Sequence, residues 1–172
     1  AGISILNPSS GTLIENLYGI YATSSSTGPV TITGNTVGSS TAGLSNVTGN
    51  TYNSTGTIYT AGIFAPAALT NNISTNAVTN VAYTAGGTSS GFIQTVGIFH
   101  AVPGTNAAVA GSSNTVQSNT ISNINSSSPN AVTDIKASVV GLLFNNTSNG
   151  NTVGQNIIHS VANTASTTNA VN

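Results

Sequence analysis

A six-residue phrase recurs four times along the chain and constrains its fold more than any other feature. Each copy reads branched apolar residue, two small or polar residues, asparagine, any residue, branched apolar residue. The copies span 32–37, 73–78, 116–121 and 153–158, with their asparagines at Asn35, Asn76, Asn119 and Asn156. Self-similarity at a period of roughly 40 residues is typical of repeat architectures, in which a unit buries its apolar side only against its neighbours. We therefore expect the chain to form a stack of repeats.

A second phrase precedes each asparagine phrase and begins with a glycine followed by apolar residues. Its glycines are Gly19, Gly62, Gly97 and Gly141, and a further apolar residue stands a few positions earlier, at Ile14, Ile58, Ile93 and Ile135. The two phrases divide the chain into units at about 12–56, 57–90, 91–132 and 133–172. Each unit supplies two apolar strands and a polar corner, and we take each glycine to mark the start of a coil. Residues 1–172 are expected to form a single domain, a segment or subunit of a longer stack.

The asparagine phrase has a direct structural meaning. Its branched residues favour extended backbone, whereas asparagine tolerates the left-handed conformation better than most residues and can bend a strand sharply. Short strands joined by such corners predict an all-β fold, a parallel β-solenoid of about four coils of roughly 40 residues. The four asparagines would then lie one above another, and their amides would bond to each other in a ladder.

Composition excludes several classes of function. Only 2% of the residues are charged, and the single basic residue, Lys136, cannot neutralise a phosphate backbone, so nucleic acid is not expected as a partner. The longest apolar run, 139–144, is far shorter than the ~20 residues of a membrane-spanning helix. Because the chain starts at Ala1 without a signal peptide, we expect it to be processed or part of a longer protein.

Residues able to perform catalysis are few and scattered. The acids Glu15 and Asp134 belong to the first and last units, too far apart for the paired carboxylates of a glycosidase. His100 follows a glycine phrase and His159 an asparagine phrase, which places them on different sides of a coil. A metal site needs three or four convergent ligands. The sequence thus predicts no catalytic residue, no cofactor and no metal.

With these residues in hand, the chain resembles the right-handed parallel β-helix repeat proteins of the pectin-lyase-like superfamily. The segments 30–37, 114–124 and 151–161 are similar to repeats of large, Ser/Thr/Asn-rich surface proteins secreted by Bacteroidota. The resemblance implies a right-handed β-helix and an extracellular or cell-surface location. Enzymatic members of that superfamily cut acidic polysaccharides with clustered carboxylates, a bound calcium ion and a basic residue. This chain lacks that set of groups.

The function expected from these observations is structural: a stalk, an adhesin segment or a filament. Open β edges favour self-association or continuation in a longer chain. The tyrosines at 18, 21, 52, 59 and 83 are expected to pack along the coil flanks, with contacts to glycans or cell surfaces as the alternative. An ice-binding or glycan-binding protein remains a second possibility, although Thr31 and Thr33 form a threonine pair that the other units do not repeat. A carbohydrate-active enzyme is the third.

Overall fold

The computed structural model describes residues 3–7, 16–23, 29–48, 57–66, 70–84, 93–111, 113–128 and 137–165. Regular structure within these ranges consists of strands, without a helix, and hence none that is long and apolar enough to cross a membrane. The strands are β1 (Ile3–Asn7), β2 (Leu17–Tyr21), β3 (Val30–Thr33), β4 (Thr36–Val37), β5 (Leu44–Thr48), β6 (Ile58–Phe64), β7 (Asn71–Ser74), β8 (Ala77–Thr84), β9 (Ile93–His100), β10 (Thr115–Gln117), β11 (Thr120–Ser126), β12 (Val139–Phe144), β13 (Thr152–Gly154) and β14 (Ile157–Asn163).

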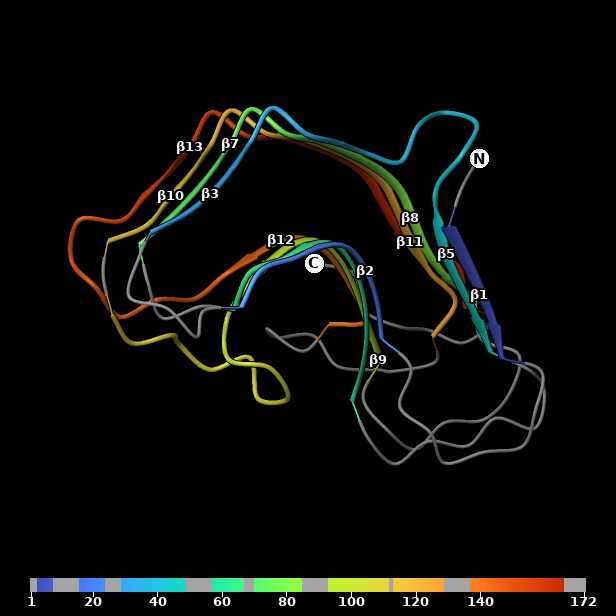
Figure 1. The fold of residues 1–172 in the computed structure, drawn as a ribbon. Coiled ribbons are helices and arrows are strands. Elements are labelled where there is room, and N and C mark those ends of the chain that lie inside the picture. The colour runs from blue at the N-terminus through green and yellow to red at the C-terminus, as the bar shows by residue number, and fades with distance from the viewer. Residues whose placement is uncertain are drawn as a thin grey trace.

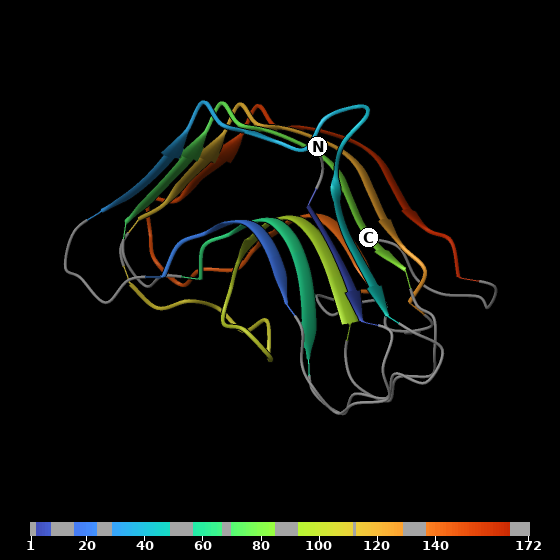
Figure 2. The ribbon, with the colours of Figure 1, turned by 45° about the vertical axis from the view of Figure 1, so that its right-hand side comes forward.

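The strands form three parallel sheets. Sheet A has six strands in the order β1-β5-β8-β11-β14, with β4 also paired to β8. Sheet B has the order β2-β6-β9-β12, and sheet C the order β3-β7-β10-β13. Figure 2 shows the strands of each sheet side by side, and the chain visits sheets B, C and A in turn. Neighbouring strands therefore come from successive repeats of the sequence.

The core lies between the three sheets, because each repeat contributes branched apolar residues at matching positions. In sheet C, Ile32, Ile73, Val116 and Val153 are register partners in that order. In sheet A the corresponding row is Val37, Val78, Ile121 and Ile158. One apolar cluster contains residues of all three sheets, and Figure 1 shows the sheets arranged around this common interior.

The prediction of a right-handed parallel β-solenoid of about four coils of roughly 40 residues is corrected by this topology. The described residues form separate parallel sheets of six, four and four strands. The connections from sheet A to sheet B fall at least partly in 8–15, 49–56, 85–92 or 129–136, outside the described residues, so no complete coil is shown. The β content and the parallel pairing are as the sequence indicates.

Two local features distinguish the observed repeats from units of two strands and a corner. The asparagine corner divides what was expected to be one strand into two, so that a repeat contributes to three sheets. In the first repeat, residues 38–43 also occupy the place that Thr79 and Asn80 fill in the second, between the partner pairs Val37↔Val78 and Leu44↔Val81. Strands β1 and β5 give sheet A additional members at that end.

Candidate functional site

The asparagines of the recurring phrase lie in one row at the corner between sheets C and A. The backbone N–H and the side-chain Nδ2 of Asn35 both donate to Oδ1 of Asn76, at 3.0 Å each. Asn76 donates in the same way to Asn119, at 3.0 Å for both bonds. Asn119 donates to Oδ1 of Asn156 at 3.0 and 2.9 Å. The row therefore has a direction, with donors facing the C-terminal repeat and acceptors facing the N-terminal one.

Each inner side chain of this row also bonds to the preceding strand of sheet C. Nδ2 of Asn76 donates to the Ile32 carbonyl at 2.8 Å, and Nδ2 of Asn119 donates to the Ile73 carbonyl at 2.9 Å. Asn76 and Asn119 are only 2% and 1% exposed. Buried polar groups are costly unless they are hydrogen-bonded, and here the amides bond on both sides. The row thus fixes the spacing and register of successive repeats.

The left-handed residue at the corner is not the asparagine, and that part of the prediction is wrong. Positive φ angles of 69°, 57°, 55° and 56° occur at Gly34, Thr75, Ser118 and Gln155, the residues immediately before the four asparagines. The bend one position earlier leaves the asparagine side chains directed along the row, where the amides of Asn76 and Asn119 are each held by two neighbours. Hydrogen bonding along the row therefore requires asparagine at its position, and the residue immediately before it makes the turn.

A second row of asparagines lies at the opposite end of sheet C, and the sequence analysis missed it. Asn71 donates to Oδ1 of Asn114 from its backbone N–H at 2.7 Å and from its side chain at 2.8 Å. The Asn114 backbone N–H donates to Oδ1 of Asn151 at 2.9 Å. Each of these residues stands five positions before an asparagine of the first row. That constant spacing is the signal that could have revealed the second row.

The four recurrent glycines lie inside the strands of sheet B, where that sheet passes close to sheet A. A Cβ atom built on Gly97 would lie 2.4 Å from both the Gly141 carbonyl oxygen and the Ile121 side chain. Cβ atoms on Gly19, Gly62 and Gly141 would meet Val37, Val78 and Ile158 at 2.4, 2.2 and 2.4 Å. The glycines allow the close approach of the two sheets, and each lies inside its strand. The prediction that they mark the start of a coil is not tested, because no complete coil is described.

Aromatic rings form a row along the outer face of sheet B. Tyr21, Phe64 and Phe99 are register partners, and the Phe64 and Phe99 ring centroids are 4.5 Å apart with nearly parallel planes. Tyr59 contacts both phenylalanines, and its hydroxyl donates to Asn106 Oδ1 at 3.0 Å. Burial raises the pKa of Tyr59.

The tyrosines differ in exposure. Tyr59 and Tyr83 are buried, Tyr18 is half-buried, and Tyr21 is 57% exposed at the free edge of sheet B. Tyr18 also stacks on Tyr21, with ring centroids 4.9 Å apart. Tyr52 lies outside the described residues. Packing is therefore the role of the buried pair, and Tyr21 is the tyrosine with the most surface available to a partner.

The two histidines lie in contrasting environments. His100 is fully buried, donates from Nδ1 to the Ala65 carbonyl at 2.8 Å, and accepts at Nε2 from the Asn146 amide at 3.3 Å. Burial lowers the pKa of His100, and the bond to Ala65 offsets part of this effect. His159 is exposed on β14 and contacts the Ser160 hydroxyl at 3.1 Å. The bonds of His100 fit a neutral ring in a structural role.

The charged residues fall outside the part of the chain that the structure describes. They are Glu15, Asp134 and Lys136, so the prediction that the acids lie far apart is not tested. Among the described residues, no group of three or more His, Cys, Asp or Glu side chains lies close enough together to hold a metal ion.

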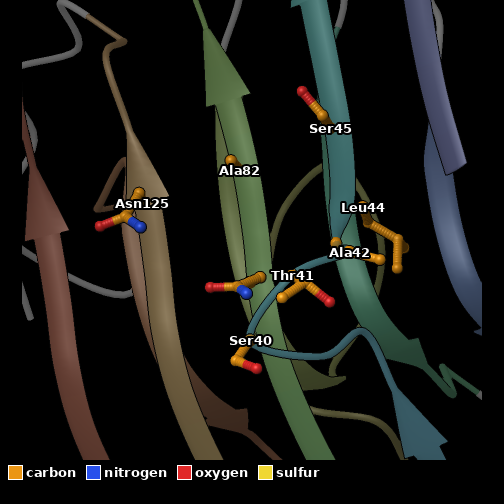
Figure 3. Close-up of a pocket in the computed structure, with 9 residues that line it drawn as sticks. Ser40, Thr41, Ala42, Leu44, Ser45, Ala82 and Asn125 are labelled. Atoms are coloured by element: carbon orange, nitrogen blue, oxygen red, sulfur yellow. The ribbon is translucent and has the colours of Figure 1, made fainter. Parts of the chain in front are cut away.

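A hollow of about 290 Å³ lies on sheet A beside the inserted loop of the first repeat. Figure 3 shows Ser45, Ala82 and Asn125 on three adjacent strands, with Ser40 and Thr41 of the loop beside them. The side chains that line it offer hydroxyl and amide groups and no carboxylate, imidazole or amine. The hollow can form hydrogen bonds, but it holds no acid or base for catalysis.

The three sheets end together at the C-terminal repeat, on the edge strands β12, β13 and β14. There the core positions are open: Val153 is 47% exposed and Ile158 44% exposed, whereas their partners Val116 and Ile121 are fully buried. Ile157, on the same strand as Ile158, is 61% exposed. Among the described residues, no further strand pairs with the outer edges of β12, β13 and β14, and apolar side chains are exposed beside these edges.

Comparisons of the chain with protein-family models, with curated proteins and with solved structures find no match.

Proposed function

We propose that this chain is a structural, non-catalytic protein that works outside the cell as a segment of a stalk, adhesin or filament. The observation that carries the proposal is the open C-terminal end, where core residues remain exposed on three edge strands. Edge strands offer unpaired N–H and C=O groups that readily pair with another chain. The resemblance to large secreted repeat proteins supports the extracellular location.

Joining at this end would bury the exposed side chains. Full burial of a valine or isoleucine side chain contributes about 1.5–3 kcal/mol, so covering the exposed halves of Val153 and Ile158 yields roughly 1 kcal/mol each. Backbone hydrogen bonds along β12, β13 and β14 add to this gain. The partner that fits best is another set of three parallel edges, either in a second copy or in the continuation of a longer chain.

Low charge and dense hydrogen bonding support a structural role. Few charges means little repulsion between copies, and the asparagine rows connect successive repeats through buried amides. The ice-binding alternative has less support, because the partners of Thr31 and Thr33 in the next repeat are Asn72 and Ser74 rather than threonines. Regularly spaced threonine pairs are what an ice-binding surface needs.

Negative-stain electron microscopy and sedimentation velocity over a range of protein concentrations test the proposal. We expect thin filaments of uniform width, and we expect Ile158→Lys to abolish them because it would bury a charge at the junction. Thr120→Lys places the same charge on an exposed inner-repeat position and should leave the filaments intact. Far-UV circular dichroism confirms that both variants fold. A monomer at every concentration contradicts self-association.

A further inference from the structure

The two ends of the chain are complementary in hydrogen bonding. Within the described part of the chain, the backbone N–H of Asn156 has no acceptor and Oδ1 of Asn35 has no donor. Every inner step of the row joins those two kinds of group. A second copy that presents its Asn35 to Asn156 continues the row, whereas two identical ends cannot pair in this way. Joining of unlike ends is heterologous and generates an open filament.

The same register identifies the strands that would meet. Ile158 belongs to the row of Val37, and Val161 belongs to the row of Leu44 through Val81 and Ile124. A second copy that continues the rows would therefore place its β4 beside Ile158 and its β5 beside Val161–Asn163 of β14. In sheets B and C, its β2 and β3 would meet β12 and β13.

Strand β1 stands in the way of this pairing. It pairs in parallel with β5 on the side opposite β8, and its first three register pairs are Ile3↔Leu44, Ser4↔Ser45 and Ile5↔Asn46. Those three residues of β5 are the ones that Val161, Ala162 and Asn163 of the other copy would need. One strand edge cannot pair with two strands on the same side.

We infer that β1 is a removable cap: it occupies the edge of β5 that β14 of a second copy requires, so that copies join end to end only when β1 leaves β5. This inference rests on the proposed function, because it presumes that copies join through their sheet edges. It adds the polarity of the junction, its register and the segment that controls it. In sheets B and C, no described strand pairs with the outer edges of β2 and β3.

A reversible lock on β1 tests the inference without removing any segment. The chain has no cysteine, and Ser4 and Ser45 are register partners on adjacent strands, whose separation of about 4.8 Å lies in the range a disulfide spans. Oxidised Ser4→Cys/Ser45→Cys protein should require at least about tenfold more protein to form filaments, and reduction should restore the unmodified behaviour. Thr79→Cys/Ser122→Cys forms a matched disulfide between two inner strands and should assemble equally in both redox states.

Deletion of residues 1–7 provides the opposite perturbation and should lower the protein concentration at which filaments appear. If the oxidised lock assembles as readily as the reduced form, or if the deletion hinders assembly, the cap is refuted while end-to-end joining stands. If neither the full chain nor the deletion variant assembles at any concentration, both the cap and the proposed self-association are refuted. Circular dichroism of the deletion variant establishes whether it is folded.

Discussion

Replacing Asn119 by alanine should be among the most destabilising single changes to a polar residue in this chain. Its Oδ1 accepts two hydrogen bonds from Asn76, and its Nδ2 donates to the Ile73 carbonyl and to Asn156. Only 1% of its surface is exposed, so water cannot readily replace these partners.

The magnitude follows from the groups left behind. Removal of the amide deprives the buried backbone N–H of Asn76 of its acceptor and the Ile73 carbonyl of a donor. An unsatisfied buried polar group costs about 1–3 kcal/mol, so the free energy of unfolding should fall by about 2–5 kcal/mol. At about 2–4 °C per kcal/mol for a domain of this size, the melting temperature should drop by roughly 4–20 °C.

Urea unfolding followed by circular dichroism measures this change. Asn125→Ala is the matched control. Asn125 lies on β11, the strand that follows Asn119, and its side chain is half-buried and outside the row. Its free energy of unfolding should change by no more than about 0.5 kcal/mol. Equal effects of the two substitutions would refute the argument that the row holds neighbouring repeats together.

Two further predictions concern packing and pH. Gly97→Ala should lower the free energy of unfolding by about 3 kcal/mol or more, because its Cβ meets backbone, whereas Gly154→Ala, with open space around it, should change stability little; thermal melts of both variants would expose an error if they agree. Since burial lowers the pKa of His100 in the folded state, the unfolded chain binds the extra proton first, and the free energy of unfolding should decline as pH falls below about 6.5. Denaturant titrations across pH should show that His100→Gln removes this decline and that His159→Gln retains it; an unchanged slope in His100→Gln would count against the assignment.

The sequence is most informative where a chemical requirement repeats. The recurring asparagine phrase predicts that Asn35, Asn76, Asn119 and Asn156 lie together, and the structure places them in one hydrogen-bonded row. The phrase does not reveal which residue adopts the left-handed conformation, because no side-chain group is common to all four residues that adopt it, Gly34, Thr75, Ser118 and Gln155. The hydrogen bonds of the row require an asparagine amide, whereas several residue types adopt a positive φ at the preceding position.

Other features depend on contacts that are distant in sequence. The glycines are recognisable in the sequence as a pattern. The reason for glycine there is the close approach of sheets B and A, which becomes clear only when the positions of Ile121 and its equivalents are known. The burial of His100 likewise depends on Ala65 and Asn146, neither of which belongs to a recurring phrase. The division into three sheets, and the placement of β1 on β5, follow from pairing choices that apolar periodicity alone leaves open.

The rows of asparagine and apolar residues require one register between successive repeats, and pairs of introduced cysteines measure that register most directly. Thr79 and Ser122 are partners on β8 and β11, with hydroxyl oxygens 3.0 Å apart, so Thr79→Cys/Ser122→Cys should oxidise rapidly and completely. Thr79→Cys/Thr120→Cys is offset by two residues, which separates the Cα atoms by about 8 Å, and should remain largely reduced under the same conditions. Faster oxidation of the offset pair, or failure of both pairs, would contradict the parallel register on which the rows of asparagine and apolar residues rest.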